Sequence, residues 1–266
     1  MTTLLRLVPA PLIRAAGRLQ FKMPFLAKPI NFIGQKLASQ GVIQRGAGKG
    51  LRFNGRGCSP GYVAGTSHLL EQELLVKHLR PGAVFYDVGA NAGFYAIIGA
   101  RAVGTEGQVY AFEPMPRLVE RIRENATLNS QTNVAVIEAA VSDRDGVVAF
   151  AAQGSLSMLS SIRAAGKVAD TISVPSLRLD TFSLRNRPPD LILMDIEGDE
   201  VQALHGALQT ISRSRPVLMI EIHYVGRAFV DFYERALKPL GYVGSTYDGK
   251  PLRTEKVHYH ALLLPG

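Results

Sequence analysis

From about residue 65 onward, short apolar runs alternate with stretches that repeat apolar residues at helical spacing. Each apolar run is four to six residues long, as expected for strands that are buried on both faces of a sheet. Strands that alternate with helices are typical of βαβ units, because parallel strands need a crossover connection. The pattern therefore predicts an α/β fold built on a doubly wound, mostly parallel sheet.

The apolar runs predict the main strands, and the helical patterns predict the helices between them. The expected main strands are residues 83–88, 108–112, 134–138, 191–194 and 217–222. The expected helices are residues 69–79, 92–103, 115–126, 201–211 and 229–240.

Two further pairs of strands are expected outside this core pattern. Residues 147–150 and 172–174 flank a polar, serine-rich stretch at 153–161, which is either a mobile lid or a surface excursion. Near the C-terminus, residues 241–246 and 257–264 suit an antiparallel pair joined by an Asp-Gly turn. We therefore expect the last strand to run antiparallel to its neighbours.

The composition limits the class of protein. A chain of 266 residues with 47% hydrophobic and 20% charged residues can bury a substantial core and is not intrinsically disordered. Its single cysteine, Cys58, can form no internal disulfide and supplies no cysteine-rich zinc site. No uninterrupted apolar stretch is long enough to span a bilayer. We therefore expect a globular, cytoplasmic protein that is either soluble or attached to the surface of the membrane.

Positive charge is concentrated at the N-terminus. The net charge is +8, and residues 1–70 carry ten Lys and Arg with no acidic residue before Glu71, so the rest of the chain is nearly neutral. The N-terminal segment is consistent with a basic membrane anchor, an organelle transit peptide or a solvated extension, and the sequence leaves all three open. Because the body of the chain is not strongly basic, we expect no nucleic-acid partner.

The segment with the most chemical information joins the first main strand to the helix that follows it. It reads DVGANAG from Asp87 to Gly93. Gly89 lets the chain turn sharply out of the strand, and Gly93 lets the start of the helix approach a ligand. Glu113 ends the next strand twenty residues after Gly93, where an acidic side chain can bind both hydroxyls of a ribose. Together they predict a nucleoside-bearing cofactor.

The charge of this segment discriminates between nucleoside cofactors. A dinucleotide site brings a G-x-G-x-x-G turn to a pyrophosphate, so that backbone amides meet the anion. Here Asp87 enters the turn, and its negative charge suits an ammonium or a sulfonium group better than a pyrophosphate. S-adenosylmethionine carries both cations and a ribose. We therefore predict that S-adenosylmethionine is the cofactor.

Four segments between about residues 65 and 225 together resemble the FkbM-type S-adenosylmethionine-dependent methyltransferases: FYDVGANAGFY, YAFEP, LILMDIEGDE and VLMIEIH. The resemblance implies a class I methyltransferase domain, which we place at residues 65–266 after a basic extension at 1–64. It also implies O-methylation of a sugar, glycan or natural product, with residues 140–142 near the adenine. The predicted cofactor-binding residues are Asp87, Gly89, Asn91, Gly93, Phe94, Glu113, Pro114, Ala140, Val141 and Ser142.

Acidic residues and a histidine end the fourth and fifth main strands: Asp195 and Glu197 follow the fourth, and Glu221 and His223 end the fifth. Because the carboxyl ends of adjacent parallel strands converge, we predict that these four side chains surround the transferred methyl group. An imidazole is suited to general-base work near neutral pH, and the carboxylates can steer an acceptor hydroxyl or bind a divalent ion. We favour metal-free chemistry, because this spacing does not define a shared coordination sphere and the other histidines show no ligand pairing.

Two other functions stay open at this point. One is a nicotinamide-dependent oxidoreductase on the same architecture, against which the absence of a G-x-G-x-x-G turn counts. The other is a membrane-associated, non-catalytic binding protein that acts through its basic extension. For a methyltransferase, the expected partner is a small-molecule or glycan acceptor. The identity of the acceptor, a peripheral membrane contact and the oligomeric state are not fixed by the sequence.

Overall fold

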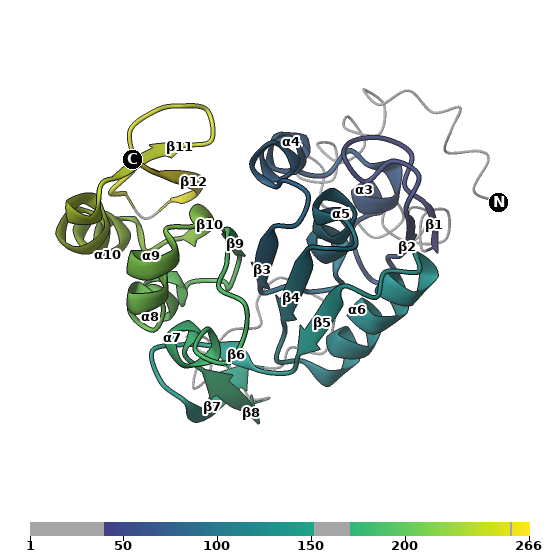
Figure 1. Cartoon of the computed structure of the whole chain (residues 1–266), viewed down its shortest axis with the longest axis horizontal. Coiled ribbons are helices and arrows are strands. Elements are labelled where there is room, and N and C mark those ends of the chain that lie inside the picture. The colour runs from purple at the N-terminus through teal and green to yellow at the C-terminus, as the bar shows by residue number, and fades with distance from the viewer. Residues whose placement is uncertain (1–39, 152–170, 256) are drawn as a thin grey trace, which may run out of the picture.

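The main sheet of the protein contains the five predicted main strands and the predicted C-terminal pair. The computed structural model describes residues 40–151, 171–255 and 257–266 (Figure 1). Within these residues, a seven-stranded sheet has the order β11-β12-β10-β9-β3-β4-β5. Its strands are β3 (Val84–Val88), β4 (Gln108–Phe112), β5 (Val134–Ile137), β9 (Leu191–Met194), β10 (Val217–His223), β11 (Tyr242–Thr246) and β12 (His258–Pro265).

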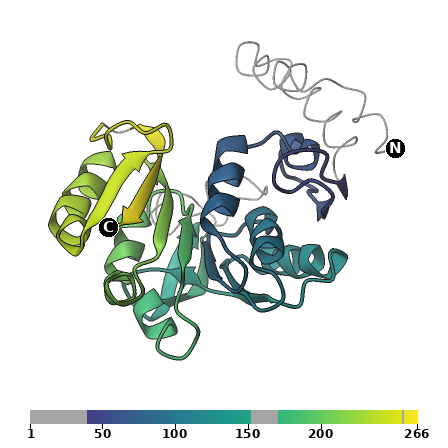
Figure 2. The same ribbon diagram turned by 45° about the horizontal axis from the view of Figure 1, so that its top comes forward.

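The direction of the strands confirms the predicted fold class. Strands β5, β4, β3, β9 and β10 are parallel to one another, whereas β12 runs antiparallel to both β10 and β11. The sheet is therefore doubly wound and mostly parallel, with an antiparallel strand contributed by the C-terminus. Figure 2 shows these C-terminal strands in yellow at one end of the molecule and the N-terminal ribbon in purple at the other.

Two hydrophobic cores explain why the strands read as continuous apolar runs. Tyr86 and Val88 on β3 belong to the core on one face of the sheet, while Phe85 between them belongs to the core on the other face. Because both faces are covered by helices, successive side chains are buried on alternate sides and no polar residue is needed between them.

Helices cover the two faces in separate groups. The face on which Phe85 lies, called the first face from here on, carries α3 (Pro60–Ala64), α4 (Leu69–His78), α5 (Phe94–Val103) and α6 (Pro116–Leu128). The second carries α7 (Leu179–Phe182), α8 (Glu200–His205), α9 (Leu208–Ser214) and α10 (Gly226–Phe232), which continues as a π-helical turn (Tyr233–Leu237) and a 3-10 turn (Lys238–Leu240). Within the described residues, no helix is both long enough and apolar enough to cross a membrane.

One predicted helix is in fact two. The stretch expected as a helix over 201–211 is divided into α8 and α9 at Gly206 and Ala207. At Gly206 the backbone passes so close to Ser142 that a Cβ atom would lie 2.0 Å from the carbonyl oxygen of Ser142. The amide of Asp180 also donates to the Gly206 carbonyl over 2.9 Å. This close approach between segments far apart in sequence is invisible to helical periodicity.

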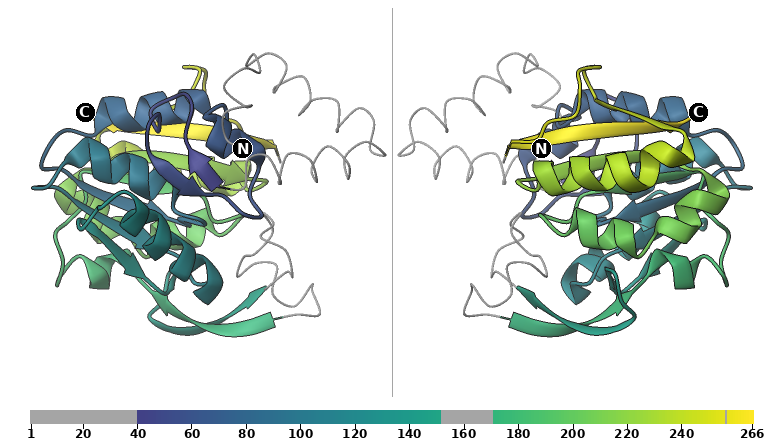
Figure 3. Two further views of the ribbon diagram at one scale, coloured as in Figure 1. Left: turned by 90° about the vertical axis from the view of Figure 1, so that its right-hand side faces the viewer. Right: turned by 90° about the vertical axis from the view of Figure 1, so that its left-hand side faces the viewer.

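The two outlying strands of the middle segment form a small sheet. β7 (Gly146–Ala151) pairs antiparallel with β8 (Thr171–Leu177), and β8 pairs in parallel with the short β6 (Ala140–Val141). Figure 3 shows the β7–β8 ribbon extending beneath the main body. The serine-rich stretch predicted as a lid or a surface excursion lies outside the described residues.

Residues 40–64 pack onto the first face of the sheet. They contain β1 (Gln40–Val42), β2 (Arg52–Asn54) and α3, and they bury Ile43, Phe53 and Val63 in the same core as Phe85 of β3. The backbone amide of Asn54 donates to Oδ1 of Asn125 on α6 over 2.6 Å. The part of the basic extension that the structure describes is thus packed against the sheet domain. The predictions for residues 1–39 lie outside the described residues.

Candidate active site

The turn after β3 is held between the carboxyl ends of β4 and β9. Gly89 has φ 85°, and a Cβ atom there would lie 1.9 Å from the carbonyl oxygen of Asp195, so only glycine fits. The amides of Gly89 and Ala90 both donate to the carbonyl of Phe112 over 3.0 Å. The neighbouring strands β9, β3 and β4 are therefore tied together at the edge of the sheet where ligands bind in such folds.

Asp87 is a buried carboxyl group beneath this turn. Its side chain is only 1% exposed, and no described residue meets its oxygens with an ordinary hydrogen bond. Burial raises the pKa of Asp87 to about 8, and the charges of Glu71 and Glu113 add to the rise, while the backbone amide of Ala96 acts against it. A nearby cation would stabilise the ionised form, because it would replace the solvent that Asp87 has lost.

Glu113 is fixed at the end of β4 by two backbone amides. Asn91 donates to Oε2 over 2.9 Å, and Met115 donates to Oε1 over 3.0 Å. Burial raises the pKa of Glu113 to about 7, although these two hydrogen bonds and the charge of Arg117 act against the rise. Each oxygen keeps a further lone pair, so the carboxylate is oriented in advance to accept hydrogen bonds from a pair of hydroxyls.

A cavity of about 490 Å³ opens above these residues. Seven of the ten predicted cofactor residues line it: Gly89, Asn91, Phe94, Glu113, Pro114, Ala140 and Val141. The other three do not. Asp87 lies buried beneath the turn, Gly93 faces Ile122 of α6, and the backbone of Ser142 lies against Gly206.

Aromatic side chains that the sequence analysis did not select complete the wall of the cavity. Phe53 and Tyr62 come from the N-terminal segment and Phe150 comes from β7. Phe53 and Tyr62 pack on Phe94, with ring centroids 5.5 and 4.7 Å from the Phe94 ring. Helical or strand periodicity does not reveal these residues, because they reach the cavity from parts of the chain outside the parallel strands.

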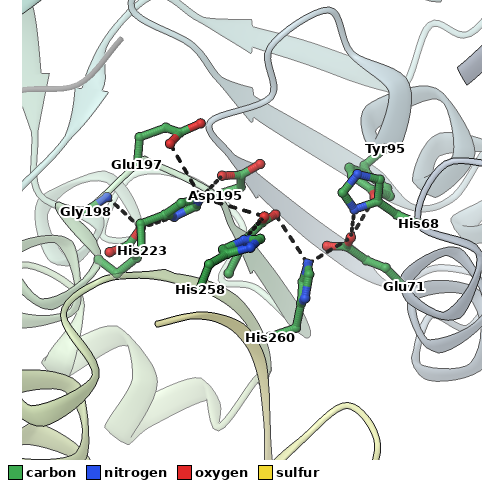
Figure 4. A network of polar contacts seen from close by, with 11 residues as sticks. His68, Glu71, Tyr95, Asp195, Glu197, Gly198, His223, His258 and His260 are labelled. Atoms are coloured by element: carbon green, nitrogen blue, oxygen red, sulfur yellow. Dashed lines mark hydrogen bonds and ion pairs between the residues drawn. The ribbon is translucent and has the colours of Figure 1, made fainter. Parts of the chain in front are cut away.

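The four residues predicted to surround the methyl group lie close together, because three carboxylates converge on one ring nitrogen of His223. Nε2 of His223 lies 3.7 Å from Asp195, 3.5 Å from Glu197 and 3.7 Å from Glu221 (Figure 4). All four line the cavity. Glu197 has φ 56°, a conformation that is unfavourable for a side chain with a Cβ atom, so the turn after β9 holds it there under strain.

A fourth carboxylate, which was not predicted from the sequence, orients the imidazole. Glu200 at the start of α8 is fully buried, and its Oε1 lies 2.9 Å from Nδ1 of His223. The amide of Gly198 donates to the same oxygen over 2.9 Å. Because Nδ1 is occupied, Nε2 is the nitrogen that faces the cavity. The signal in the sequence is the pair Asp199–Glu200 that ends the segment IEGDE, but local spacing alone does not link Glu200 to His223.

Crowding of carboxylates shifts the pKa values in this cluster. Burial raises the pKa of Glu197 to about 7, with His223 acting against the rise and Glu221 adding to it. Burial, followed by the charges of Glu221 and Glu197, holds the pKa of Asp195 well above its usual range. Burial alone would lower the pKa of His223, but Glu200, Glu197 and Glu221 outweigh it and raise the pKa. The cluster is therefore built to hold and exchange protons near neutral pH.

The strand order, with its one reversed strand, and the carboxylates at the ends of β3 and β4 define the class I methyltransferase architecture. A model of the Methyltransferase FkbM domain family matches residues 87–243, which is more than half of the chain. The chain belongs to this family. The expected protein class, an S-adenosylmethionine-dependent methyltransferase, is thereby confirmed at the level of the family.

Individual relatives match only parts of the chain. The hexuronic acid methyltransferase AglP of Haloferax volcanii is 29% identical over 158 residues, covering 56% of this chain and 60% of AglP. The 2-O-methyltransferase NoeI of Sinorhizobium fredii is 28% identical over 172 residues, covering 56% of this chain and 68% of NoeI. A protein-L-isoaspartate O-methyltransferase of Ignicoccus hospitalis is 34% identical over 77 residues, covering 29% of this chain and 36% of that protein.

Among solved structures, an FkbM methyltransferase from Methylobacillus flagellatus superposes with a TM-score of 0.47. It is 16% identical in sequence, and the match covers 77% of this chain and 53% of that chain. The matches to AglP, NoeI and the isoaspartate methyltransferase span from about a third to about two thirds of the length of those three relatives.

Proposed function

We propose that this protein transfers the methyl group of S-adenosylmethionine to a hydroxyl oxygen of a sugar or glycan. The observation that carries the proposal is the position of Glu113: it is fixed by two amides at the end of β4 and lines the same cavity as His223. The ribose-binding carboxylate and a proton acceptor therefore share one enclosed space, as methyl transfer to a hydroxyl requires.

The residues around the turn fit this cofactor. Glu113 offers acceptor oxygens to the ribose hydroxyls, and Asp87 supplies a buried negative charge beneath the turn where the amino and sulfonium groups carry positive charge. Phe94, Ala140 and Val141 give the cavity an apolar surface for the adenine. We assign the ten predicted cofactor residues to this site, with Asp87, Gly93 and Ser142 acting from behind its wall.

Removal of the hydroxyl proton is the work of His223 in this proposal. S-adenosylmethionine, when bound, supplies a methyl group on a positively charged sulfur, and the acceptor oxygen must lose its proton as the new bond forms. Nε2 of His223 takes this proton, while Glu200 holds Nδ1 and stabilises the resulting imidazolium. Asp195 and Glu197 accept hydrogen bonds from the acceptor, and Glu221 adds negative charge beside Nε2.

The acceptor class rests on two of the relatives. AglP is a methyltransferase of a hexuronic acid, and NoeI is a 2-O-methyltransferase. A cavity lined by both carboxylates and aromatic rings suits an acceptor with polar hydroxyl edges and an apolar ring face. Labelled methyl groups from the cofactor should therefore appear on sugars, as detected by mass spectrometry. Labelling confined to proteins or to other small molecules would contradict the acceptor class.

We also propose that the catalytic unit begins near residue 40 rather than at residue 65. Phe53 and Tyr62 line the cavity, and Val63 packs in the core beneath α5. On this proposal the segment from residue 40 to residue 64 supplies part of the binding site and belongs to the catalytic domain.

Cofactor binding tests the proposal directly. Replacing Glu113 by alanine removes two charge-assisted hydrogen bonds to the ribose, so we expect affinity for S-adenosylmethionine to fall roughly 10- to 100-fold in a calorimetric titration. Glu120→Ala, at an exposed position on α6, is the matched control and should bind as wild type does. Equal affinity in both variants, or no binding by the folded wild-type chain, would refute the proposed cofactor site.

A further inference from the structure

A second cluster of ligand-bearing side chains lies where α4 meets the C-terminal strands. It consists of His68, just before α4, Glu71 in the first turn of α4, Glu221 on β10 and His260 on β12 (Figure 4). Three parts of the chain that are distant in sequence thus contribute: the start of α4 supplies two side chains, and β10 and β12 supply one each. The sequence analysis found no ligand pairing for His68 or His260, because nothing in their spacing shows that α4 lies over β12.

The pairing of the strands brings two of these residues together. Glu221 and His260 are direct partners across the antiparallel β10–β12 ladder. Side chains directly opposite each other in such a ladder point to the same face of the sheet. That face is the one covered by α4, as shown by Met219 and Leu262, the neighbouring ladder pair on the same side, which belong to the core of the first face.

The distances within the cluster are those expected around a small metal ion. Nδ1 of His68 is 3.2 Å from Oε2 of Glu71, and Nε2 of His260 is 3.8 Å from Oε2 of Glu71 and 3.5 Å from Oε2 of Glu221. One ligand atom from each of the four residues lies within 4.8 Å of the other three. Ligand atoms about 2.1 Å from a tetrahedral ion lie roughly 3.4 Å from one another, and the three distances given above, 3.2 to 3.8 Å, bracket that value.

The nitrogen at the centre of this cluster has no hydrogen bond. Nε2 of His260 is buried, and no described residue meets it with hydrogen-bond geometry. It lies 3.8 Å from Glu71 and 3.5 Å from Glu221, within ion-pair distance of both carboxylates but without hydrogen-bond geometry, and both carboxylates are more than nine-tenths buried. A buried, unsatisfied nitrogen that faces two buried carboxylates is costly unless something occupies the space between them.

Other side chains orient the two carboxylates from outside the cluster. The hydroxyl of Tyr95 donates to Oε2 of Glu71 over 2.7 Å, and Nε2 of His258 contacts Oε1 of Glu221, which leaves Oε2 of Glu221 facing His260. Metal-binding carboxylates are commonly fixed by such outer contacts.

We propose that His68, Glu71, Glu221 and His260 bind one divalent transition-metal ion. Two imidazole nitrogens and two carboxylate oxygens at tetrahedral spacing suit zinc, and the proposal goes beyond the methyl transfer proposed above. Four protein ligands leave no open position, so the ion ties α4 to β10 and β12 rather than reacting with substrate. Since His68 and Glu221 also line the cavity, the ion fixes part of its wall.

Binding of Co²⁺, a spectroscopic substitute for zinc, tests this proposal without acceptor or cofactor. The full chain, freed of metal by a chelator, should bind one equivalent of Co²⁺ with the intense visible absorption of a tetrahedral centre. One equivalent of Zn²⁺ should abolish that absorption. At 100 times its Kd, Zn²⁺ should raise the Tm by about 5 °C. Absence of stoichiometric binding by the folded wild-type chain would overturn the proposal, whatever the outcome for methyl transfer.

Variants locate the ion. Glu71→Gln, which preserves the size of the side chain, and His260→Ala should each weaken Co²⁺ binding roughly 100-fold and remove the Zn²⁺-dependent rise in Tm. His205→Ala is the control, because that ring packs on Phe232 of α10, on the other face of the sheet, and metal binding should be unchanged. If His260→Ala does not fold, Glu71→Gln carries the same comparison. Metal binding that survives in both folded cluster variants would overturn this site.

Discussion

Single residues at the strand ends set the electrostatics of the site. Asp87 and Glu113 are buried carboxyl groups whose pKa values are raised to about 8 and about 7, chiefly by burial. The sequence predicted both residues, because acids at the ends of adjacent parallel strands follow from the strand pattern. It did not predict Glu200, or that His258 and His260 lie beside Glu221, because these contacts depend on which elements pack together.

The raised pKa of Asp87 predicts a dependence of stability on pH. A carboxyl group whose pKa is higher in the folded state binds more protons there than in the unfolded state, so it costs stability as pH rises from about 4 to about 8. We expect Asp87→Asn, without cofactor, to be more stable than wild type at pH 8 by about 2 kcal/mol or more. This advantage should vanish near pH 4, as measured by denaturant unfolding at each pH.

The same variant should bind S-adenosylmethionine more weakly, since the amide cannot supply negative charge to the cationic groups. A variant that is stabilised at pH 8 and yet binds the cofactor as tightly as wild type would place the positive charge of the cofactor away from Asp87.

Contact with Glu200 predicts a change in the titration of His223. Glu200 raises the pKa of His223 through its hydrogen bond and its charge, so Glu200→Gln should lower that pKa. The imidazole resonances, followed by NMR against pH, measure this without knowledge of the acceptor. Glu234→Gln, at an exposed position distant in sequence, serves as the control. An unchanged His223 titration in Glu200→Gln would remove Glu200 as the positioning residue.

At the scale of elements, prediction succeeded where one element is buried on both sides and failed where two elements touch. The parallel strands were found because alternating burial leaves a continuous apolar run. The break between α8 and α9 was missed, because it arises where Gly206 passes Ser142. Pro239, which has no N–H group to donate, likewise marks the region where α10 gives way to π-helical and 3-10 turns.

Substitution of Gly206 tests the importance of that close approach. A methyl group would overlap the Ser142 carbonyl, so Gly206→Ala should reduce the free energy of unfolding by about 1–3 kcal/mol, despite the higher helix propensity of alanine. Gln202→Ala, at an exposed position on α8, should change it by less than about 0.5 kcal/mol. Chemical denaturation of both variants gives the comparison, and a neutral Gly206→Ala would show that the two segments separate easily.

At the scale of the whole molecule, the doubly wound, mostly parallel sheet followed from the sequence, whereas the contribution of residues 40–64 did not. Their side chains enter the core through β1, β2 and α3, which are too short to show a periodic pattern. Residues 1–70 carry basic but no acidic side chains, and this charge pattern suggested that residues 1–64 form an extension. Charge, however, describes the exposed side chains, whereas Ile43 and Phe53 decide where the segment packs.

Truncation separates these two descriptions of the N-terminal segment. A chain beginning at residue 40 keeps the buried Ile43, Phe53 and Val63, and it should fold and bind the cofactor. A chain beginning at residue 65 loses the buried Ile43, Phe53 and Val63, and it should be destabilised by several kcal/mol or be insoluble. Thermal melting of both truncated chains provides the measurement. A stable chain from residue 65 with full cofactor affinity would restore the later boundary.

The reversed final strand has a consequence for how this protein tolerates change. In a β-strand the side-chain direction alternates at every residue, so a shift of β12 by one position against β10 would turn His258 and His260 towards the opposite face. Such a slip would leave the backbone ladder almost intact but would remove both imidazoles from Glu221 at once. The register of the terminal hairpin therefore determines whether these imidazoles meet Glu221 of β10. An insertion in either strand of the hairpin should disrupt these contacts more than an insertion in the loop between the strands.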